Sequence, residues 1–283
     1  MLLLSGSDDG SCCLWDARSA RPACAIAGHG GEVAGIGFSG ESRLVVARGA
    51  EIHVYDQRAL GPASRRASDT TATVARVANA HGAAEIQAIS TRGDFVAYVD
   101  EDGRLGVCDV TDPADATCFS GGHGALASCV CFHPEAPVVA TGGFDRRVLV
   151  WDIAAESIAA SACADGEDDP GANQLVNPPF VYALDFAPDC DGTVVSGHAD
   201  GRLMQFVRSR PEVLATAGLD CTIRLWDADA VTDPGTAPAA GGGVPAPLGC
   251  CRLAAKPDAI ATSEAAPVVY VDQDSSIVAY ALV

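Results

Sequence analysis

Basic residues are scarce in this sequence of 283 residues. Lysine and arginine together number 18 against 37 aspartates and glutamates, which gives a formal net charge of −19. A protein that grips the phosphate backbone needs a basic face, so this balance argues against a general nucleic-acid-binding protein. Lysine is almost missing, because 17 of the 18 basic residues are arginine, whose planar guanidinium suits bidentate recognition of carboxylates. We therefore expect no direct nucleic-acid partner.

Long apolar runs are also missing. No stretch of 18 apolar residues exists, so the sequence predicts no membrane-spanning helix. The first residues, Met-Leu-Leu-Leu-Ser, have no basic segment and are followed by Asp8 and Asp9, which is not the pattern of a signal peptide. We expect no membrane partner.

The twelve cysteines lack the spacing of a metal site or a disulfide framework. No Cys-x-x-Cys occurs; the close pairs are Cys12-Cys13, Cys250-Cys251 and Cys129-x-Cys131. Most lie in apolar segments, where cysteine behaves as a small hydrophobic residue. Free thiols indicate a reducing compartment, so we expect the protein in the cytoplasm, the nucleus or both.

What the sequence does contain is a recurring spacing. An Asp stands six residues before an aromatic or apolar residue, with a short alternating run between them. The six pairs are Asp9/Trp15, Asp102/Cys108, Asp145/Trp151, Asp200/Phe206, Asp220/Trp226 and Asp274/Tyr280. A seventh copy, ending at Tyr55-Asp56, has Gly49 in place of the Asp. Fixed spacing with variable filler is typical of repeats.

The segments around these pairs predict an all-β protein. Runs such as 127–132, 138–141 and 147–151 are short, rich in β-branched and apolar residues, and bounded by Gly, Pro and Asp. No long stretch has the apolar period of a helix. The repeat ends lie 40, 53, 43, 55, 20 and 54 residues apart, against about 40–45 residues for a four-stranded propeller blade.

The motifs Gly28-His29, Gly122-His123, Trp15-Asp16, Trp151-Asp152 and Trp226-Asp227, with Ala80-His81 as a degenerate copy, resemble the WD-repeat β-propeller family over the whole chain. The resemblance implies one domain, residues 1–283, with seven blade equivalents. It also implies a buried relay in intact blades from His to Ser or Thr to Asp to Trp. One blade matches fully, with His123, Thr141, Asp145 and Trp151.

Two places fall short of complete blades. The chain opens directly on a second-strand sequence, so we expect the first blade to lack its inner strand. The 20-residue gap between Phe206 and Trp226 is half a blade, which predicts a missing outer strand in blade five and a missing inner strand in blade six. Two other segments are longer than a blade connection needs. Residues 164–179 are predicted to form an acidic loop, and residues 228–247, rich in Ala, Gly and Pro, a flexible linker.

Three catalytic or ligand-binding interpretations are weaker than structural ones. The relay residues resemble a hydrolase triad, but their repeat positions favour blade architecture. Gly35-x-Gly37-x-x-Gly40 fits the glycines of a dinucleotide fingerprint, but no βαβ unit follows. The six histidines have no metalloprotease spacing. We expect no enzyme activity, cofactor, metal or small-molecule substrate.

Trp15-Asp16-Ala-Arg18 is echoed by Tyr55-Asp56-Gln-Arg58, whereas the equivalents of the two arginines are Ala154 and Asp229 elsewhere. The pattern is similar to the box by which WD-repeat proteins dock on the damaged-DNA-binding adaptor of cullin-4 ubiquitin ligases. Propeller topology puts both arginines on the face opposite the Gly-His loops, in adjacent blades. An alternative is that arginine near a strand end is simply common on propellers.

The function expected from these features is a non-catalytic protein-interaction platform, and the docking pattern favours a substrate receptor of a cullin-4 RING ligase. The segments 48–58, 174–178 and 272–280 are similar to a small WD-repeat propeller grouped with such receptors. The main alternative is a generic WD-repeat scaffold with no link to ubiquitin ligases. A third class, an enzyme, lacks a convergent nucleophile, base or metal set.

Overall fold

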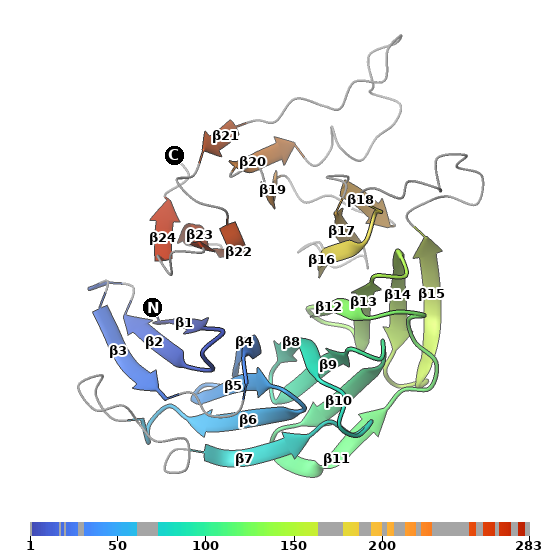
Figure 1. The fold of residues 1–283 in the computed structure, drawn as a ribbon, viewed down its shortest axis with the longest axis horizontal. Coiled ribbons are helices and arrows are strands. Elements are labelled where there is room, and N and C mark those ends of the chain that lie inside the picture. Colours follow the sequence, from blue (N-terminus) through green and yellow to red (C-terminus); the bar gives the residue numbers. More distant parts are fainter. Residues whose placement is uncertain are drawn as a thin grey trace. The chain divides into compact units, whose positions relative to one another are not determined.

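The structure is a computed structural model of the whole chain. It describes residues 2–16, 18–19, 21–27, 31–60, 73–163, 178–186, 194–199, 203–206, 213–218, 222–227, 249–252, 257–263, 266–272 and 277–280. Side chains are described up to residue 199, apart from those of 113–115. All regular elements in these ranges are β-strands, so the all-β prediction is confirmed (Figure 1).

The strands form seven sheets, each antiparallel between neighbours. Three sheets have four strands: β4 (Val33–Ser39), β5 (Arg43–Arg48), β6 (Glu51–Asp56) and β7 (Thr73–Ala78); β8 (Ile86–Arg92), β9 (Phe95–Asp100), β10 (Leu105–Asp109) and β11 (Asp112–Cys118); and β12 (Ala127–Phe132), β13 (Val138–Gly143), β14 (Arg147–Asp152) and β15 (Ser157–Cys163).

The other four sheets have three strands each within the described ranges. They are β1 (Leu2–Gly6), β2 (Cys12–Asp16) and β3 (Arg21–Ile26); β16 (Val181–Phe186), β17 (Val194–His198) and β18 (Leu203–Phe206); β19 (Val213–Gly218), β20 (Thr222–Asp227) and β21 (Gly249–Arg252); and β22 (Pro257–Ser263), β23 (Ala266–Asp272) and β24 (Ile277–Tyr280). The seven sheets agree in number with the seven blade equivalents that the sequence predicts.

Among the described residues, the strands at these places agree with the repeat spacing. The first described strand, β1, takes the position of a second strand. In the fifth sheet the last described strand is β18, a third strand, and in the sixth the first is β19, a second strand; residues 207–212 lie outside the described residues. The last sheet, β22–β24, also has three strands among the described residues. The predicted linker 228–247 and most of the acidic loop 164–179 lie outside the described residues.

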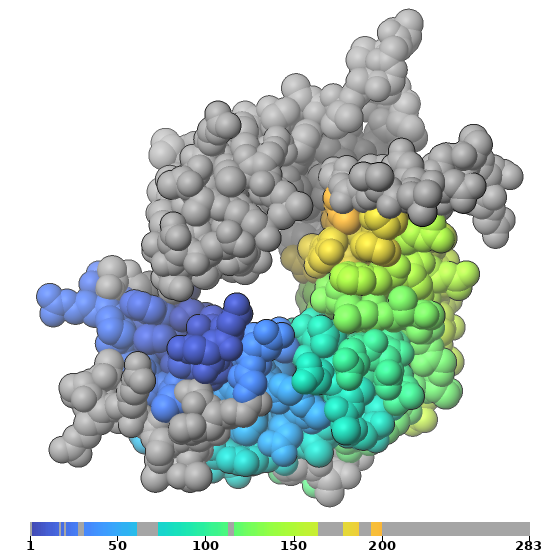
Figure 2. Space-filling model, in the orientation of Figure 1, coloured from blue at the N-terminus to red at the C-terminus, as the bar shows by residue number. Residues whose placement is uncertain are grey.

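The chain divides into two compact units, one formed by residues 1–186 and 192–207 and the other by residues 187–191 and 208–283. The first unit holds the first five sheets, and the second holds the sheets β19–β21 and β22–β24. All described side chains lie in the first unit, coloured from blue to yellow-orange in Figure 2.

The core of the first unit lies between successive sheets, and β5 shows why its strands are almost continuously apolar. Leu44 and Val46 point into a cluster shared with β2 and β3, whereas Val45 and Ala47 point into a cluster shared with β9 and β10. A strand with a neighbouring sheet on each face buries both sets of alternating side chains. The pattern of the sequence therefore follows from stacking sheet against sheet.

Glycine is needed where inner strands approach each other closely. A Cβ built on Gly35 of β4 would lie 2.8 Å from Ile89 Cγ1, and one on Gly37 would lie 2.5 Å from Thr91 Cγ2, both in β8. These are the glycines of the apparent dinucleotide fingerprint. They allow two blades to pack and do not open a helix.

Candidate functional site

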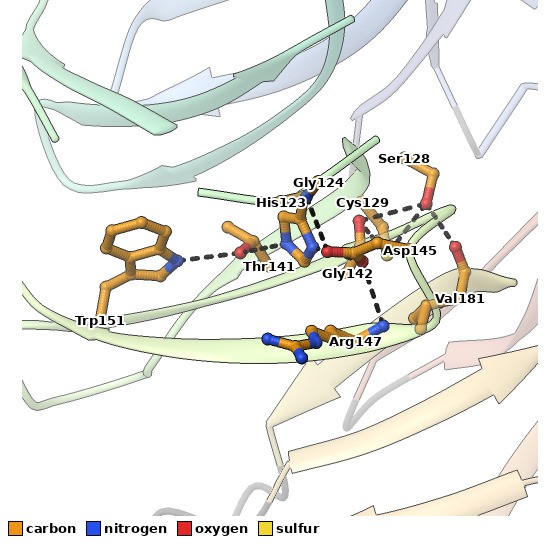
Figure 3. Close-up of polar contacts among 10 residues, drawn as sticks. All are labelled: His123, Gly124, Ser128, Cys129, Thr141, Gly142, Asp145, Arg147, Trp151 and Val181. Atoms are coloured by element: carbon orange, nitrogen blue, oxygen red, sulfur yellow. Dashed lines mark hydrogen bonds and ion pairs between the residues drawn. The ribbon is translucent and has the colours of Figure 1, made fainter. Parts of the chain in front are cut away.

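The four relay residues of the fourth sheet are joined by hydrogen bonds (Figure 3). Trp151 Nε1 donates to Thr141 Oγ1 at 2.9 Å, and Thr141 Oγ1 lies 2.9 Å from His123 Nε2. His123 Nδ1 lies 2.8 Å from Asp145 Oδ1. The bonds therefore run Trp151–Thr141–His123–Asp145, with the carboxylate at one end. The order expected from the family resemblance, which put the Asp between the hydroxyl and the indole, is wrong.

The order has a simple chemical reason. An ionised carboxylate only accepts, and an indole only donates, so each is suited to an end of the network. Asp145 accepts the proton on His123 Nδ1, which leaves Nε2 to accept the hydroxyl hydrogen of Thr141. The hydroxyl oxygen is then available to the indole N–H. Every polar atom in the series has a partner, which is the condition for a buried polar network to stabilise a core.

Asp145 is also held by the backbone. Its carboxylate accepts from Gly124 N at 2.9 Å and Arg147 N at 3.1 Å. Burial opposes ionisation, but the hydrogen bonds from His123, Gly124 and Arg147 outweigh it, and the pKa of Asp145 lies below its ordinary value. The carboxylate thus ties the loop before β12 to the turn between β13 and β14.

This set is unsuited to nucleophilic catalysis. The Thr141 side chain has no solvent exposure, and its hydroxyl is occupied by the Trp151 indole and the His123 ring. A nucleophile must be reachable by its substrate. The geometry favours the architectural interpretation of these residues over the hydrolase triad.

One position of each second strand lies beside the space that the relay imidazole fills in the fourth sheet. It is two residues after the hydroxyl position, which Thr141 occupies in that sheet, and we call its occupant the slot residue. In the fourth sheet it is Gly143, which pairs with Ala127. A Cβ on Gly143 would lie 2.7 Å from His123 Nδ1. Glycine is therefore needed here to admit the imidazole supplied by the preceding loop.

In the fifth sheet the slot residue supplies the imidazole itself. Val181 pairs with His198 as Ala127 pairs with Gly143, so His198 occupies the slot, and Ser196 occupies the hydroxyl position. His198 Nε2 lies 2.8 Å from Ser196 Oγ, and Nδ1 lies 3.0 Å from Pro179 O. The sequence has no histidine between His133 and His198, so no preceding loop could provide one. Sequence reasoning missed this role, although Ser-x-His in register with Thr-x-Gly was a usable signal.

The third sheet uses acidic and phenolic groups at the same register. Its slot residue Asp100 pairs with Ile86, is fully buried, and accepts from Asn79 Nδ2 at 3.2 Å. Tyr98 stands at the hydroxyl position and accepts from Ala80 N at 2.9 Å; burial raises its pKa to about 12. His81, expected in the Gly-His position, instead lies 2.9 Å from Leu105 O.

The second sheet has a cation in the slot. Arg48 pairs with Val33, is 2% exposed, and donates from Nη1 to Tyr55 Oη at 2.9 Å. This blade is the one in which Gly49 replaces the repeat Asp. Arg48 and Tyr55 thus replace the imidazole, hydroxyl and indole with one direct bond. In the first sheet, Trp15 Nε1 donates to Ser5 Oγ at 2.9 Å.

The two predicted docking boxes have the same local geometry. Asp16 Oδ1 accepts from Arg18 N at 3.0 Å, and Asp56 Oδ1 accepts from Arg58 N at 2.8 Å. The backbone hydrogen bond from Arg18 and the hydroxyl of Ser19 lower the pKa of Asp16. Such a turn fixes the backbone two residues after the Asp. Both arginine side chains are exposed.

Arg18 and Arg58 follow third strands that end on the same side of the first unit. Arg48, beside the start of β6, has its Nη2 3.6 Å from the sulfur of Cys12, at the start of β2. The two strands therefore begin at one end, and Asp16 and Asp56 lie at the other, which we call the Trp-Asp end. Trp15 and Tyr55 lie one residue before these carboxylates; Trp15 is half-buried and Tyr55 fully buried, so they support the turns from within.

The third strands of the third and fourth sheets also end in an Asp that holds the following turn, without an arginine two residues later. Asp109 accepts from Thr111 N, two residues on, at 2.7 Å, whereas Asp152 accepts from Ala155 N, three residues on, at 3.0 Å. The Asp thus serves blade architecture in all four sheets, and arginine two residues later marks only two adjacent ones.

Metal ligation has no support in the ranges given above, where no group of three or more His, Cys, Asp or Glu is placed to hold an ion. The eight cysteines with described side chains are free thiols. No helix in the described part of the chain is long and apolar enough to cross a membrane.

Comparison with known proteins agrees with this geometry. The family profile described as "WD domain, G-beta repeat" matches residues 1–16, 116–152 and 208–227. Mitochondrial division protein 1 of Aspergillus terreus (strain NIH 2624 / FGSC A1156) is 30% identical over 108 residues, which cover 37% of this chain and 16% of that protein. The chain thus matches only a small part of that relative's length.

Two solved structures share the fold. The computationally designed Ika8 protein has a TM-score of 0.66 at 17% identity, over 98% of this chain and 79% of that chain. A chain from the crystal structure of the mitotic checkpoint complex has a TM-score of 0.56 at 15% identity, over 98% of this chain and 71% of that chain. At such identities the likeness concerns the fold alone.

Proposed function

We propose, from the premise that this chain is an all-β WD-repeat propeller, that it is a non-catalytic platform for protein–protein interaction. We propose further that it is a substrate receptor that docks on the damaged-DNA-binding adaptor of a cullin-4 RING ubiquitin ligase. The observation that carries this second step is the pair of exposed arginines, Arg18 and Arg58, each two residues after an Asp-centred turn at the Trp-Asp end.

The chemistry of the pair supports docking on a protein. Each guanidinium offers a planar fork of N–H donors to carboxylates or carbonyl oxygens, and lysine cannot reproduce that geometry. The Asp-centred turn holds the backbone beneath each arginine, so less conformational entropy is lost when a partner binds. On a chain of net charge −19, two fixed cations in neighbouring blades form a distinctive recognition feature.

A finer resemblance supports the same proposal. The segments 48–58, 174–178 and 272–280 are similar to WD repeat-containing protein 53, a small propeller grouped with cullin-4 receptors. Residues 48–58 contain one of the two docking boxes and the Arg48–Tyr55 bond. The alternative is a generic WD-repeat scaffold, in which Arg18 and Arg58 are ordinary exposed residues.

The test is adaptor binding by purified protein. Interface arginines are frequent hot spots, worth about 2 kcal/mol or more on truncation, and about 1.4 kcal/mol is a factor of ten in affinity. Arg18→Ala should therefore weaken binding of the adaptor roughly tenfold or more, and the double variant with Arg58→Ala should weaken it further. The melting temperature should hardly change, because both side chains are exposed.

The matched control is Arg147→Ala. Arg147 is also an exposed arginine of a third strand, β14. It is the first residue of that strand, so it lies at the end opposite Asp152. Its loss should leave adaptor binding within about twofold. Adaptor binding unchanged in the Arg18/Arg58 double variant would refute the ligase proposal and favour the generic scaffold.

A further inference from the structure

The outer strand β15 (Ser157–Cys163) differs from the other outer strands of the first unit. It is the last strand of its sheet, hydrogen-bonded to β14 on one side, and no other described strand pairs with it (Figure 1). A strand in this position presents backbone N–H and C=O groups along its open edge. What distinguishes β15 is the absence of features that normally discourage pairing at such an edge.

Proteins protect open edges with charged residues, prolines and bulges. The outer strand β3 begins Arg21-Pro22, β7 has Arg76 in its middle, and β11 contains Asp112, Pro113 and Asp115. The sequence of β15 is Ser-Ile-Ala-Ala-Ser-Ala-Cys, with neither charge nor proline. All four strands share an irregularity in register beside the third strand, so the bulge does not set β15 apart.

The side chains of β15 are also the least covered. β3 buries Cys24 and Ile26, and β7 buries Val77, but no residue of β15 is fully buried and six of its seven are exposed. Ile158 is 41% exposed. The strand is therefore held mainly by its backbone ladder to β14.

From this edge we infer that β15 accepts an extended segment of another protein as a fifth strand, and that this segment consists of β-branched or aromatic residues flanked by basic ones. Addition of a strand to an open edge gains main-chain hydrogen bonds, and side chains decide the specificity. Ala160, Ser161 and Ala162 are small, so a partner strand has room for large side chains beside them. The regular pairing of Ala160–Cys163 with β14 offers the longest uninterrupted edge.

Charge argues for a basic partner and against a second copy of this chain. Each copy has a net charge of −19, so two copies repel each other. An edge-to-edge pair would also set alanine and serine against alanine and serine, which buries little apolar surface. Glu156, exposed directly before β15, offers a carboxylate to a basic residue at one end of the added segment.

This site is separate from Arg18 and Arg58, and the inference does not depend on the proposed ligase role. The probe is the synthetic peptide acetyl-Arg-Thr-Val-Thr-Val-Thr-Arg-amide, added to the full chain. Amide hydrogen exchange should slow in residues 157–163, because outward N–H groups gain acceptors, and should stay unchanged in β3, β7 and β11. Two versions of the peptide with N-methyl groups on alternate residues provide the control. The version methylated on the N–H groups that face β15 should not bind, whereas the complementary version keeps those donors and should still bind.

Two variants of one exposed position sharpen the test. Ala160→Lys places a charge on the edge and repels the basic peptide, so binding should weaken at least tenfold. Ala160→Ser keeps the position small and neutral and should bind within twofold of the parent. Equal melting temperatures of both variants confirm that the fold is intact.

Three outcomes would overturn the inference. Unchanged exchange in 157–163 at saturating peptide would show that the edge does not accept a strand. Equal binding of a peptide with glutamates in place of its arginines would refute the basic partner. Protection of 157–163 without peptide that grows with protein concentration would identify a second copy as the occupant.

Discussion

The comparison of Gly143 with His198 predicts that a histidine at position 143 can take the place of His123 in the relay of the fourth sheet. The perturbation is a cycle of His123→Ala, Gly143→His and the double variant. His123 reaches the relay hydroxyl from the loop before β12, whereas His198 reaches Ser196 from the second strand. The slot register of the two sheets is the same, so the double variant imitates in the fourth sheet the arrangement of the fifth.

Each single change should destabilise the protein for a different reason. His123→Ala takes one buried hydrogen-bond partner from the Thr141 hydroxyl and one from the Asp145 carboxylate, which costs about 1–3 kcal/mol. Gly143→His adds a side chain whose Cβ would lie 2.7 Å from the His123 ring and 3.0 Å from Asp145 Oδ1. Overpacking of this kind costs about 1–3 kcal/mol.

The double variant should cost less than the two singles together. Removing the His123 ring clears the space that the introduced imidazole needs, and that imidazole can bond to Thr141. A coupling free energy of at least about 1 kcal/mol in favour of the double variant is expected, since contacting residues couple by about 0.5–3 kcal/mol. Urea denaturation of all four proteins, followed by tryptophan fluorescence, measures it. Additive losses within about 0.5 kcal/mol would refute the shared slot.

Two further predictions concern the neighbouring blades and pH. Gly106→Ala should destabilise the protein by about 1–3 kcal/mol, because the added Cβ would lie 2.2 Å from Tyr98 Cζ. The control is Gly124→Ala, whose added Cβ would meet nothing closer than 4.0 Å. Equal melting temperatures of the two variants would contradict the prediction. Asp145 has a folded pKa below its ordinary value of 3.8, so its stabilising contribution is present above that value and is lost as pH falls through the folded pKa. Stability of the parent should accordingly fall more steeply than that of Asp145→Asn in acid titrations below about pH 4, and parallel curves would show that the carboxylate is not stabilised by folding.

The sequence by itself determined the all-β fold class and the number of repeats. Local signals are strong in this chain. Turns with Gly and Asp bound the short apolar strands, and the fixed spacing from the turn Asp to the Trp sets the length of the third strand. These constraints act between residues close in sequence, so they can be read without knowing what packs against them. The grouping of His123, Thr141, Asp145 and Trp151 came instead from the resemblance to WD-repeat blades, since His123 lies 22 residues from Asp145 in the sequence.

The tertiary structure alone decided the order of the relay and the identity of the slot residues. His198, Asp100 and Arg48 have no common residue type, and only the strand register shows that they occupy one position. The exposed edge of β15 was equally invisible, because the open side of a strand depends on which strands lie beside it. Burial and partnership are properties of contacts between segments distant in sequence, and these contacts exist only once the sheets have packed.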